Sequence, residues 1–246
     1  MRIDTYLFEF GIAKSRTAAQ AMITEGRVFF DGKAVKKSSF SLPDEDFDPA
    51  RIAVKEGGCP YVSRGGLKLE GALNAFGIDP CGAIALDIGA STGGFTDCLL
   101  KHGARKVYAV DSGKEQLDAR LKNDPRVHAI ESYNARYMKP SDFEDVPTLA
   151  VMDVSFISQT LLYPAIASVL PIGADLISLV KPQFEVGRQG IGSGGIVRSE
   201  KLRKEALERV KLTAVQYGLT PIASIASPIT GGDGNHEFLV HFRRTK

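Results

Sequence analysis

Two carboxylates near the middle of the chain stand where ligand chemistry is expected. Asp87 lies inside the apolar run AIALDIG (83–89), and Asp111 ends the next apolar run, KVYAVDS (106–112). An acidic residue at the end of the second strand is placed to accept hydrogen bonds from two ribose hydroxyls. A carboxylate at the end of the preceding strand suits a cationic group, such as the ammonium of a methionine moiety. Together they favour S-adenosylmethionine as the ligand.

The turn between these carboxylates differs from a dinucleotide-binding turn. Glycines stand at 89, 93 and 94, so the pattern G-x-G-x-x-G is absent, whereas a pyrophosphate would favour it. The glycines still allow the backbone to approach a ligand closely. The residues predicted to bind the cofactor are Asp87, Gly89, Ala90, Ser91, Gly93, Gly94, Phe95, Asp111, Asn134 and Asp153.

Two of these assignments have a plainer alternative. The loop could be a tight turn with an acidic residue beside a helix start, although Asp111 in register with it makes that less favoured. Asn134 follows a probable third strand at 127–131 and is expected to meet the adenine. An exposed loop amide explains Asn134 equally well.

Strands and helices must alternate to position these residues. Apolar runs at 83–89, 106–112, 148–156 and 174–182 predict buried strands. Helix-like stretches lie between them, at 94–102, 113–122, 158–169 and 199–217. Such alternation predicts an α/β fold with a parallel, doubly wound sheet. Ligands on such sheets bind beyond the carboxyl ends of the strands.

The start of the chain predicts a separate α+β unit. Ile3, Leu7 and Phe10 fit the inner face of a first helix, and Ser15 is placed to cap a second helix that Gly26 ends. A unit of this size is too small to enclose an active site, so we expect a recognition module.

A hairpin and a linker complete this first unit. The sequence predicts a strand at 27–30, a turn at Asp31-Gly32 and a strand from 33. The acidic, proline-containing stretch PDEDFDPA and the glycines after it predict a linker across 43–60. The expected domains are therefore residues 1–58 and 59–246.

Bulk composition limits the class of protein. The chain has 246 residues with 43% hydrophobic and 24% charged content, ordinary values for a soluble globular protein. The net charge is only +2, so a nucleic-acid site must come from local clustering. No stretch reaches the ~18 apolar residues of a membrane helix, and the three cysteines match no zinc or disulfide spacing. We expect a cytoplasmic protein with reduced thiols, no metal and no membrane contact.

Several motifs resemble a known family, the TlyA-type proteins, which were historically called hemolysins. Their methyltransferase domain is similar to the FtsJ-type ribosomal RNA 2′-O-methyltransferases. The matching segments are YVSRGGLKLEGAL (61–73), LDIGASTGGFTD (86–97), VMDVSFIS (151–158), LVKPQFEVGR (179–188) and NHEFLVHF (235–242). The first unit resembles the small RNA-binding module of ribosomal protein S-four, through RIDTYL (2–7), KSRTAAQAMITEGRV (14–28) and DGKAVKK (31–37). The resemblance implies a Rossmann-like class I methyltransferase with a mostly parallel seven-stranded sheet.

The same resemblance implies a catalytic tetrad of two lysines and two carboxylates. The motifs place it at Lys68, Asp153, Lys181 and Glu237. A 2′-hydroxyl must lose its proton as its oxygen is methylated, and a positioned base contributes about 10²–10⁴-fold to such a step. Lys181 is the predicted base, because a buried strand end beside a second cation, Lys68, favours the neutral amine. Asp153 and Glu237 would then orient the amines and balance the charge.

Each of the four also has an ordinary structural explanation. Lys68 could be a surface lysine on a helix, and Asp153 could cap the helix that follows it. Glu237 could pair with an arginine, and Lys181 could be an exposed strand end before Pro182. Four coincident matches make these explanations less favoured jointly than singly.

The residues after Asp153 favour oxygen as the methyl acceptor. Enzymes that methylate exocyclic amines often carry Asn/Asp-Pro-Pro-aromatic at this point, but here the chain reads Asp153-Val154-Ser155-Phe156. Neither 153–156 nor 181–184 contains a cysteine that could attack a pyrimidine ring, so covalent carbon-5 methylation is not expected.

Basic residues gather at the start of the chain. Residues 1–40 hold seven basic and four acidic side chains, a net charge of +3. Such a module would read the shape of an RNA backbone more than its sequence, although a solvated charged face is the alternative. The predicted RNA contacts are Arg2, Lys14, Ser15, Arg16, Arg27, Lys33, Lys36, Lys37, Arg64 and Arg188.

A glycine-rich loop follows the predicted base. The stretch EVGRQGIGSGGIVR (185–198) has five glycines and two arginines, which suggests a substrate lid that orders over RNA. A flexible surface loop is the alternative.

The sequence therefore predicts a methyltransferase that uses S-adenosyl-L-methionine and acts on ribosomal RNA or ribosomal subunits, not on DNA. A non-catalytic RNA-binding protein on the same fold is one alternative, and methylation of transfer RNA is another. A pore-forming hemolysin is disfavoured, because such a protein needs amphipathic hairpins or apolar helices.

Overall fold

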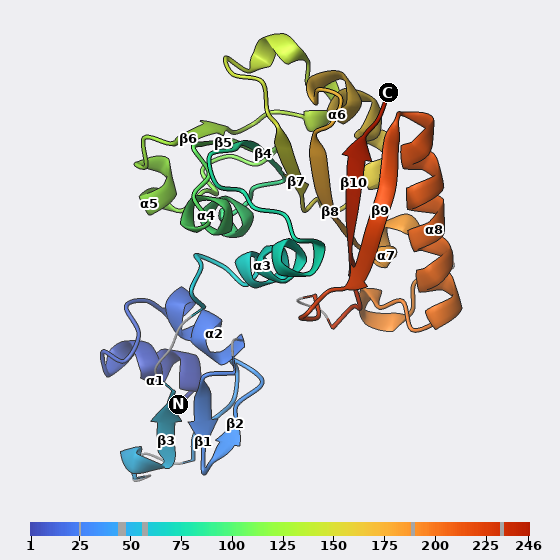
Figure 1. Cartoon of the computed structure of the whole chain (residues 1–246). Coiled ribbons are helices and arrows are strands. Elements are labelled where there is room, and N and C mark those ends of the chain that lie inside the picture. The colour runs from blue at the N-terminus through green and yellow to red at the C-terminus, as the bar shows by residue number, and fades with distance from the viewer. Residues whose placement is uncertain (25, 44–47, 56–58, 188–189, 232–233) are drawn as a thin grey trace. The chain divides into compact units, whose positions relative to one another are not determined.

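The computed structural model describes residues 1–24, 26–43, 48–55, 59–187, 190–231 and 234–246. Two compact units make up the chain, an N-terminal unit, Met1–Pro60, and a C-terminal unit, Tyr61–Lys246 (Figure 1). The boundary predicted from the sequence falls two residues earlier, beside residue 58, which lies outside the described residues.

Two helices begin the N-terminal unit, α1 (Ile3–Glu9) and α2 (Arg16–Thr24). Ser15 caps α2 as predicted, since its Oγ accepts a hydrogen bond of 3.1 Å from the amide of Ala18. The prediction for Phe10 was wrong, because α1 ends at Glu9 and leaves this ring 62% exposed. Tyr6 takes the buried position instead, and the Phe10 ring stacks on it with centroids 4.3 Å apart.

A three-stranded antiparallel sheet completes this unit, in the order β2-β1-β3. The predicted hairpin is confirmed in β1 (Val28–Phe30) and β2 (Lys33–Ala34), with positive φ at both turn residues, Asp31 and Gly32. The linker prediction was wrong in part, because η1 (Pro49–Arg51) and β3 (Ile52–Val54) belong to this unit. A strand of three residues is too short for an alternating pattern to stand out beside a proline and several charges.

Seven strands form the sheet of the C-terminal unit, in the order β6-β5-β4-β7-β8-β10-β9 (Figure 1). Strands β4 to β8 are parallel, and β10 is antiparallel to both of its neighbours. The predicted mostly parallel, seven-stranded sheet is therefore confirmed. The strands are β4 (Ile84–Ile88), β5 (Lys106–Val110), β6 (Val127–Ile130), β7 (Leu149–Met152), β8 (Asp175–Val180), β9 (Leu219–Ala226) and β10 (Phe238–Arg244).

Alternate side chains of the buried strands serve opposite faces of this sheet. Leu86 and Ile88 pack into a core with residues of α6 (Tyr163–Val169) and α8 (Glu200–Gln216). Asp87, between them, points to the other face, where Thr96 of α4 donates a hydrogen bond to it. Helices α3 (Gly65–Phe76) and α4 (Gly94–Lys101) pack together on that second face, so the sheet is doubly wound.

Two predicted helices are confirmed and two are shorter than expected. The stretches 94–102 and 199–217 form α4 and α8. In 113–122 only α5 (Ala119–Lys122) is helical, because Asp118 caps it and Glu115 has a φ of +55°. The stretch 158–169 divides into η4 (Gln159–Leu161) and α6, where Pro164 stands in the first turn of the second helix and has no amide to donate.

The remaining short elements are η2 (Ala135–Tyr137), η3 (Pro140–Asp142), α7 (Pro182–Glu185) and η6 (Ser193–Gly195). No helix in the described part of the chain is both long and apolar enough to cross a membrane.

The chain changes direction across the sheet at β4. It runs outward from β4 through β5 to β6 and then returns to β7 on the other side of β4. The carboxyl ends of β4 and β7 therefore lie at a switch point, where open α/β sheets bind ligands. Gly89, directly after β4, has a φ of +84°, and a Cβ there would collide with the carbonyl oxygen of Asp153 after β7.

Candidate active site

Three adjoining cavities lie at the carboxyl ends of the parallel strands, with volumes of about 430, 280 and 330 Å³. Ser155 lines all three, and Asp153 lines the first two. Lys68 and Lys181 line the second and third. Shared walls make these cavities one continuous site, which we number in this order.

The first cavity is lined by Asp111, the acidic residue after β5 that was predicted to bind ribose hydroxyls. Asp111 accepts hydrogen bonds of 2.7 Å from the amides of Ser91 and Gly113, one on each carboxylate oxygen. These bonds fix the carboxylate at the cavity wall, and each oxygen keeps a lone pair for a further donor. The arrangement can therefore accept two hydroxyl groups.

Asn134 also lines the first cavity, at the start of η2. Its Oδ1 accepts a hydrogen bond of 3.1 Å from the amide of Arg136. That bond fixes the side chain and leaves its amide nitrogen available to donate a hydrogen bond to a ligand. The expected contact with an adenine ring fits this placement.

Asp87 is fully buried, two residues before Gly89, and lines none of the three cavities. Thr96 donates a 2.6 Å hydrogen bond to its Oδ2, while its Oδ1 has no partner among the described residues. Burial, with the nearby charges of Asp153 and Asp111, raises the pKa of Asp87 to about 7. A buried acceptor with unmet capacity is compatible with a cationic group of a ligand close by.

The glycine-rich turn has two distinct roles. Ala90, Gly94 and Phe95 line the second cavity. Gly93 lines none of the three cavities. It precedes α4 with a φ of +93°, and a Cβ there would collide with Leu121. A Cβ on Gly94 would collide with Ser63 Oγ, so this glycine lets α4 approach the start of α3.

The four predicted tetrad residues form two ion pairs around the second and third cavities. Lys181 Nζ lies 2.6 Å from Asp153 Oδ1, and Lys68 Nζ lies 2.5 Å from Glu237 Oε2. The second pair is nearly buried, with Lys68 8% and Glu237 4% exposed. These residues come from α3 and from the segments beside β7, β8 and β10, so only the folded sheet brings them together.

Ser155 and Phe156 are functional candidates that the sequence did not single out. Lys181 Nζ donates a 2.8 Å hydrogen bond to Ser155 Oγ. Phe156 is 92% exposed at a φ of +64° and lines the first and third cavities. An exposed aromatic ring in this strained backbone region is a frequent mark of function. Neither residue was predicted, because the apolar run at 148–156 placed both within the expected strand, whereas β7 ends at Met152.

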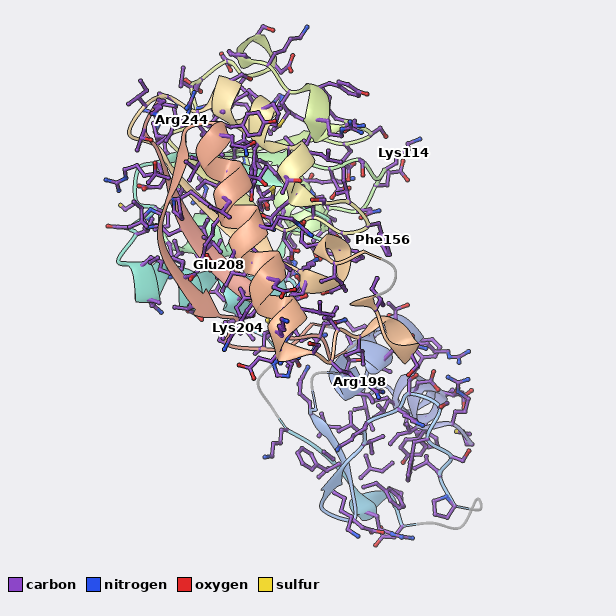
Figure 2. The ribbon with its side chains drawn as sticks, turned by 90° about the vertical axis from the view of Figure 1, so that its right-hand side faces the viewer. Lys114, Phe156, Arg198, Lys204, Glu208 and Arg244 are labelled. Atoms are coloured by element: carbon purple, nitrogen blue, oxygen red, sulfur yellow. The ribbon has the colours of Figure 1, made fainter. Side chains whose placement is uncertain are left out.

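The Phe156 side chain lies on the outer surface of the unit, on the same side as Lys114 (Figure 2). Its ring centroid is 5.2 Å from that of Phe184 on α7. The ring is therefore supported from one side and open on the other.

A buried carboxylate joins this loop to the segment after Lys181. Glu185 accepts hydrogen bonds of 2.7 Å from Ser158 Oγ and 3.0 Å from the amide of Gln159. Burial raises the pKa of Glu185. These bonds hold α7 against the loop that carries Ser155 and Phe156, a connection with no signal in the sequence.

The glycine-rich loop predicted as a lid is docked at its end. Asn235 accepts a 3.1 Å hydrogen bond from the amide of Val197 and donates one of 3.0 Å to Gly195. Val197 is buried. Arg188, predicted to contact RNA, lies outside the described residues, and the lid itself stays a prediction.

The predicted RNA contacts of the N-terminal unit are mostly exposed, but two are held by a buried acid. Arg2 and Arg16 both form ion pairs with Asp4, at 2.9 and 3.3 Å, and Gln20 also donates to it. Burial raises the pKa of Asp4, yet these hydrogen bonds together lower it below its usual range. Asp4 therefore fixes the two guanidinium groups in place.

The other predicted contacts differ in their surroundings. Lys14, Lys33, Lys36 and Lys37 are exposed, and Ser15 serves as the helix cap. Arg27 donates a 3.3 Å hydrogen bond to the carbonyl oxygen of Lys55. Arg64 lies in the other unit, where it lines the second cavity. Cys81 and Cys98 are free thiols, and no group of potential metal ligands occurs among the described residues.

Comparison with known proteins agrees with this geometry. Residues 61–244 match the FtsJ-like methyltransferase family, and residues 1–48 match the S4 domain. Over 98% of its length the chain is 40% identical to the 16S/23S rRNA (cytidine-2′-O)-methyltransferase TlyA of Mycobacterium tuberculosis, covering 89% of that protein. It is 44% identical to Hemolysin A of Brachyspira hyodysenteriae, over 98% of the chain and 99% of the relative. A solved structure of a proposed hemolysin from Streptococcus thermophilus superposes with a TM-score of 0.79 at 43% identity, covering 100% of this chain and 89% of that one.

Proposed function

The chain belongs to the FtsJ-like methyltransferase family, in its TlyA branch, and from that premise we propose that it methylates a ribose 2′-hydroxyl of ribosomal RNA with S-adenosylmethionine as the donor. One observation carries the proposal. Two lysine–carboxylate pairs border the second and third cavities, and the first cavity, which adjoins them, suits a nucleoside. Because ribosomal RNA lies in the cytoplasm of bacteria, we also propose a cytoplasmic location for this chain.

The first cavity is the proposed cofactor site. Asp111 would accept the ribose hydroxyls, and Asn134 would face the adenine. Asp87 would balance the charge of the methionine ammonium, and its Oδ1, which has no hydrogen-bond partner among the described residues, supports this fit. When bound, S-adenosylmethionine supplies an electrophilic methyl group on a sulfonium centre. Because Gly89 has no side chain, the loop after β4 lies close to Asp153, and the methyl donor could approach Asp153 and Ser155.

Lys181 is the proposed base. Asp153 and Ser155 hold its amine at the wall that the second and third cavities share. Only an unprotonated amine can accept the proton of the 2′-hydroxyl, so Lys181 would act as the base in that form. Lys68 supplies a second positive charge beside the same cavities. Glu237 holds Lys68 in place.

The third cavity is the proposed acceptor site. It runs from the two lysines to Phe156, Phe184 and the docked glycine loop. A nucleotide turned out of its stack could rest its base on the open face of Phe156 while its ribose lies at Lys181. Stacking on an aromatic ring would replace the neighbours that the base leaves.

Tritium transfer to ribosomal subunits tests the proposal directly. Subunits that lack the modification are incubated with tritiated S-adenosylmethionine and the protein, and the labelled nucleoside is identified after digestion. We expect the label in a 2′-O-methyl ribose. Lys181→Ala should lower the rate by about 10²–10⁴-fold and leave cofactor binding measured by calorimetry nearly unchanged.

Lys204→Ala is the matched control, because Lys204 lies on α8 (Figure 2) and, among the described residues, forms an ion pair only with Glu200 of the same helix. It should transfer methyl groups at the normal rate. Label on a base would overturn the acceptor assignment while keeping the cofactor site. Full activity of Lys181→Ala would remove Lys181 from the mechanism.

A further inference from the structure

A separate pocket of about 440 Å³ lies on the N-terminal unit, between the hairpin and the segment that follows it. Phe30, Val35 and Phe40 form its apolar wall, and Lys33, Lys36 and Lys37 line it as well. It shares no residue with the three cavities of the candidate active site.

Backbone hydrogen bonds fix the walls of this pocket. Ile3 of α1 donates a 2.9 Å bond to the carbonyl oxygen of Phe40, and Phe40 donates one of 3.0 Å to that of Lys37. Val35 donates a 2.8 Å bond to the carbonyl oxygen of Val28 on β1. The segment from 35 to 40 is thus tied to the helix and to the sheet, and the pocket is formed before any ligand binds.

The aromatic wall is supported behind and open in front. The ring centroids of Phe30 and Phe40 are 5.4 Å apart at an angle of 52°. The guanidinium of Arg51 lies 4.6 Å from the centroid of Phe30. Phe40 remains 37% exposed, so its side chain is accessible to a ligand in the pocket that it lines.

The charges around the pocket favour an anion. Asp31 is the acid among the lining residues, and Arg51 already engages both of its oxygens, at 2.8 and 2.5 Å. Within the described ranges, neither Lys36 nor Lys37 has a side-chain hydrogen bond or an ion pair. Their ammonium groups are therefore available for a partner.

We propose that this pocket binds one unstacked nucleobase of RNA on the ring of Phe40, with the flanking phosphates at Lys33, Lys36 and Lys37. The inference rests on the proposed function, since it assumes an RNA substrate. Lysines alone would serve a duplex backbone, which offers phosphates but keeps its bases stacked. An open aromatic ring next to them adds a surface that only an unpaired base can use. An acidic peptide would satisfy the lysines but has no planar group for the ring.

Fluorescence anisotropy on the full chain tests this assignment with two labelled RNAs. One is a single-stranded oligouridine of about twelve nucleotides, and the other is a blunt duplex of the same length. Phe40→Ala should weaken single-strand binding about 5- to 50-fold, because base–aromatic stacking carries that much affinity. Phe40→Tyr keeps the ring and should bind as the unmodified chain does. Duplex affinity should be the same in all variants.

Two further variants separate stacking from folding. Phe40→Leu fills the same space without a planar ring, so it should lose single-strand affinity as Phe40→Ala does while keeping the thermal midpoint. Phe10→Ala is the matched control, because Phe10 is 62% exposed on the same unit and lines no part of this pocket. It should change neither affinity.

Several results would overturn the inference. Normal single-strand binding by Phe40→Leu would show that the ring is not a stacking surface. Equal losses on the single strand and the duplex would show that Phe40 acts through the fold. Displacement of the RNA by oligoglutamate, with no sensitivity to the Phe40 variants, would assign the pocket to acidic peptides. If the unmodified chain binds neither RNA, the proposed function falls as well, whereas RNA binding that ignores Phe40 overturns this inference alone.

Discussion

Single residues in this protein carry roles that their types alone do not reveal. Asp87 is the clearest case, because a carboxylate on a central strand is normally ionised and solvated. Here it is fully buried with one oxygen that has no partner in the described residues. Burial therefore favours the neutral carboxyl, and a bound ammonium group nearby would favour the carboxylate.

Cofactor affinity should depend on pH through Asp87. The pKa of about 7 in the free protein means that the carboxyl is mostly protonated at pH 6 and mostly ionised at pH 8. An ammonium ligand favours the ionised form, so binding should release a proton and be about tenfold tighter at pH 8 than at pH 6. Calorimetry with S-adenosylhomocysteine at the two pH values measures this.

Asp87→Asn should bind weakly at both values, without the pH dependence. Asp79→Asn, which alters an exposed carboxyl of the same unit, should keep the dependence of the unmodified chain. A persistent tenfold change in Asp87→Asn would assign the titration to another group. The stability of the free protein should change with pH in the opposite direction. The carboxyl of Asp87 ionises at lower pH in the unfolded chain than in the folded one, so it lowers the free energy of unfolding as pH rises from about 4 to 7.

Phe156 should matter for RNA and not for stability. Its side chain is 92% exposed, so Phe156→Ala removes little buried surface. We expect kcat/KM for the RNA substrate to fall about 5- to 100-fold, the value of a lost base stack, with an unchanged thermal midpoint. Tyr137→Ala, another exposed aromatic of this unit at 70%, is the control. Equal effects of the two substitutions would refute a specific role for the ring.

At the scale of elements, the contact between the loops after β4 and β7 determines the shape of the site. Gly89 has no side chain, and this lets the first loop touch the carbonyl oxygen of Asp153 in the second. The same approach connects the first cavity to the second. A change in the backbone of either loop would therefore require a change in the other.

Gly89→Ala should weaken cofactor binding at least tenfold and lower the thermal midpoint. It combines a left-handed backbone, which costs about 1–2 kcal/mol for a residue with a Cβ, with a collision against Asp153. Gly173→Ala isolates the first effect, because its φ is +90° and its Cβ would meet no atom within 4 Å. It should lower stability slightly and leave binding intact. Identical binding by the two variants would show that the contact with Asp153 is unimportant.

At the scale of the whole molecule, each unit has its own hydrophobic core. One core holds residues of α1, α2 and the small sheet, and another fills the face of the large sheet that α6 and α8 cover. The proposed recognition and transfer roles are thus divided between two bodies. Separate cores allow each role to be tested by removing the other body.

A chain limited to residues 61–246 should fold, bind the cofactor and fail to hold RNA. Its sheet and three cavities are complete without the first unit. Circular dichroism and calorimetry should match the full chain, while affinity for ribosomal subunits in a filter assay should fall at least tenfold. That loss reflects the missing cations, so it should shrink as salt rises. Unchanged affinity would place the RNA contacts in the C-terminal unit.

The sequence by itself determined the local features of this protein. Apolar runs located four of the five parallel strands, because a strand buried on both faces must be apolar along its length. Cap and turn residues such as Ser15 and Asp31-Gly32 act on their immediate neighbours, so their roles could be predicted. The motifs also predicted the four tetrad residues, through family resemblance.

Only the tertiary structure decided which groups meet and what their surroundings do to them. Lys68 and Glu237 are far apart in sequence, and the pairing of each lysine with its own carboxylate depends on the strand order of the sheet. The burial of Asp87, the open ring of Phe156 and the pocket beside Phe40 depend on neighbours from other elements. No periodic pattern encodes such contacts, since periodicity reports only which face of an element is apolar.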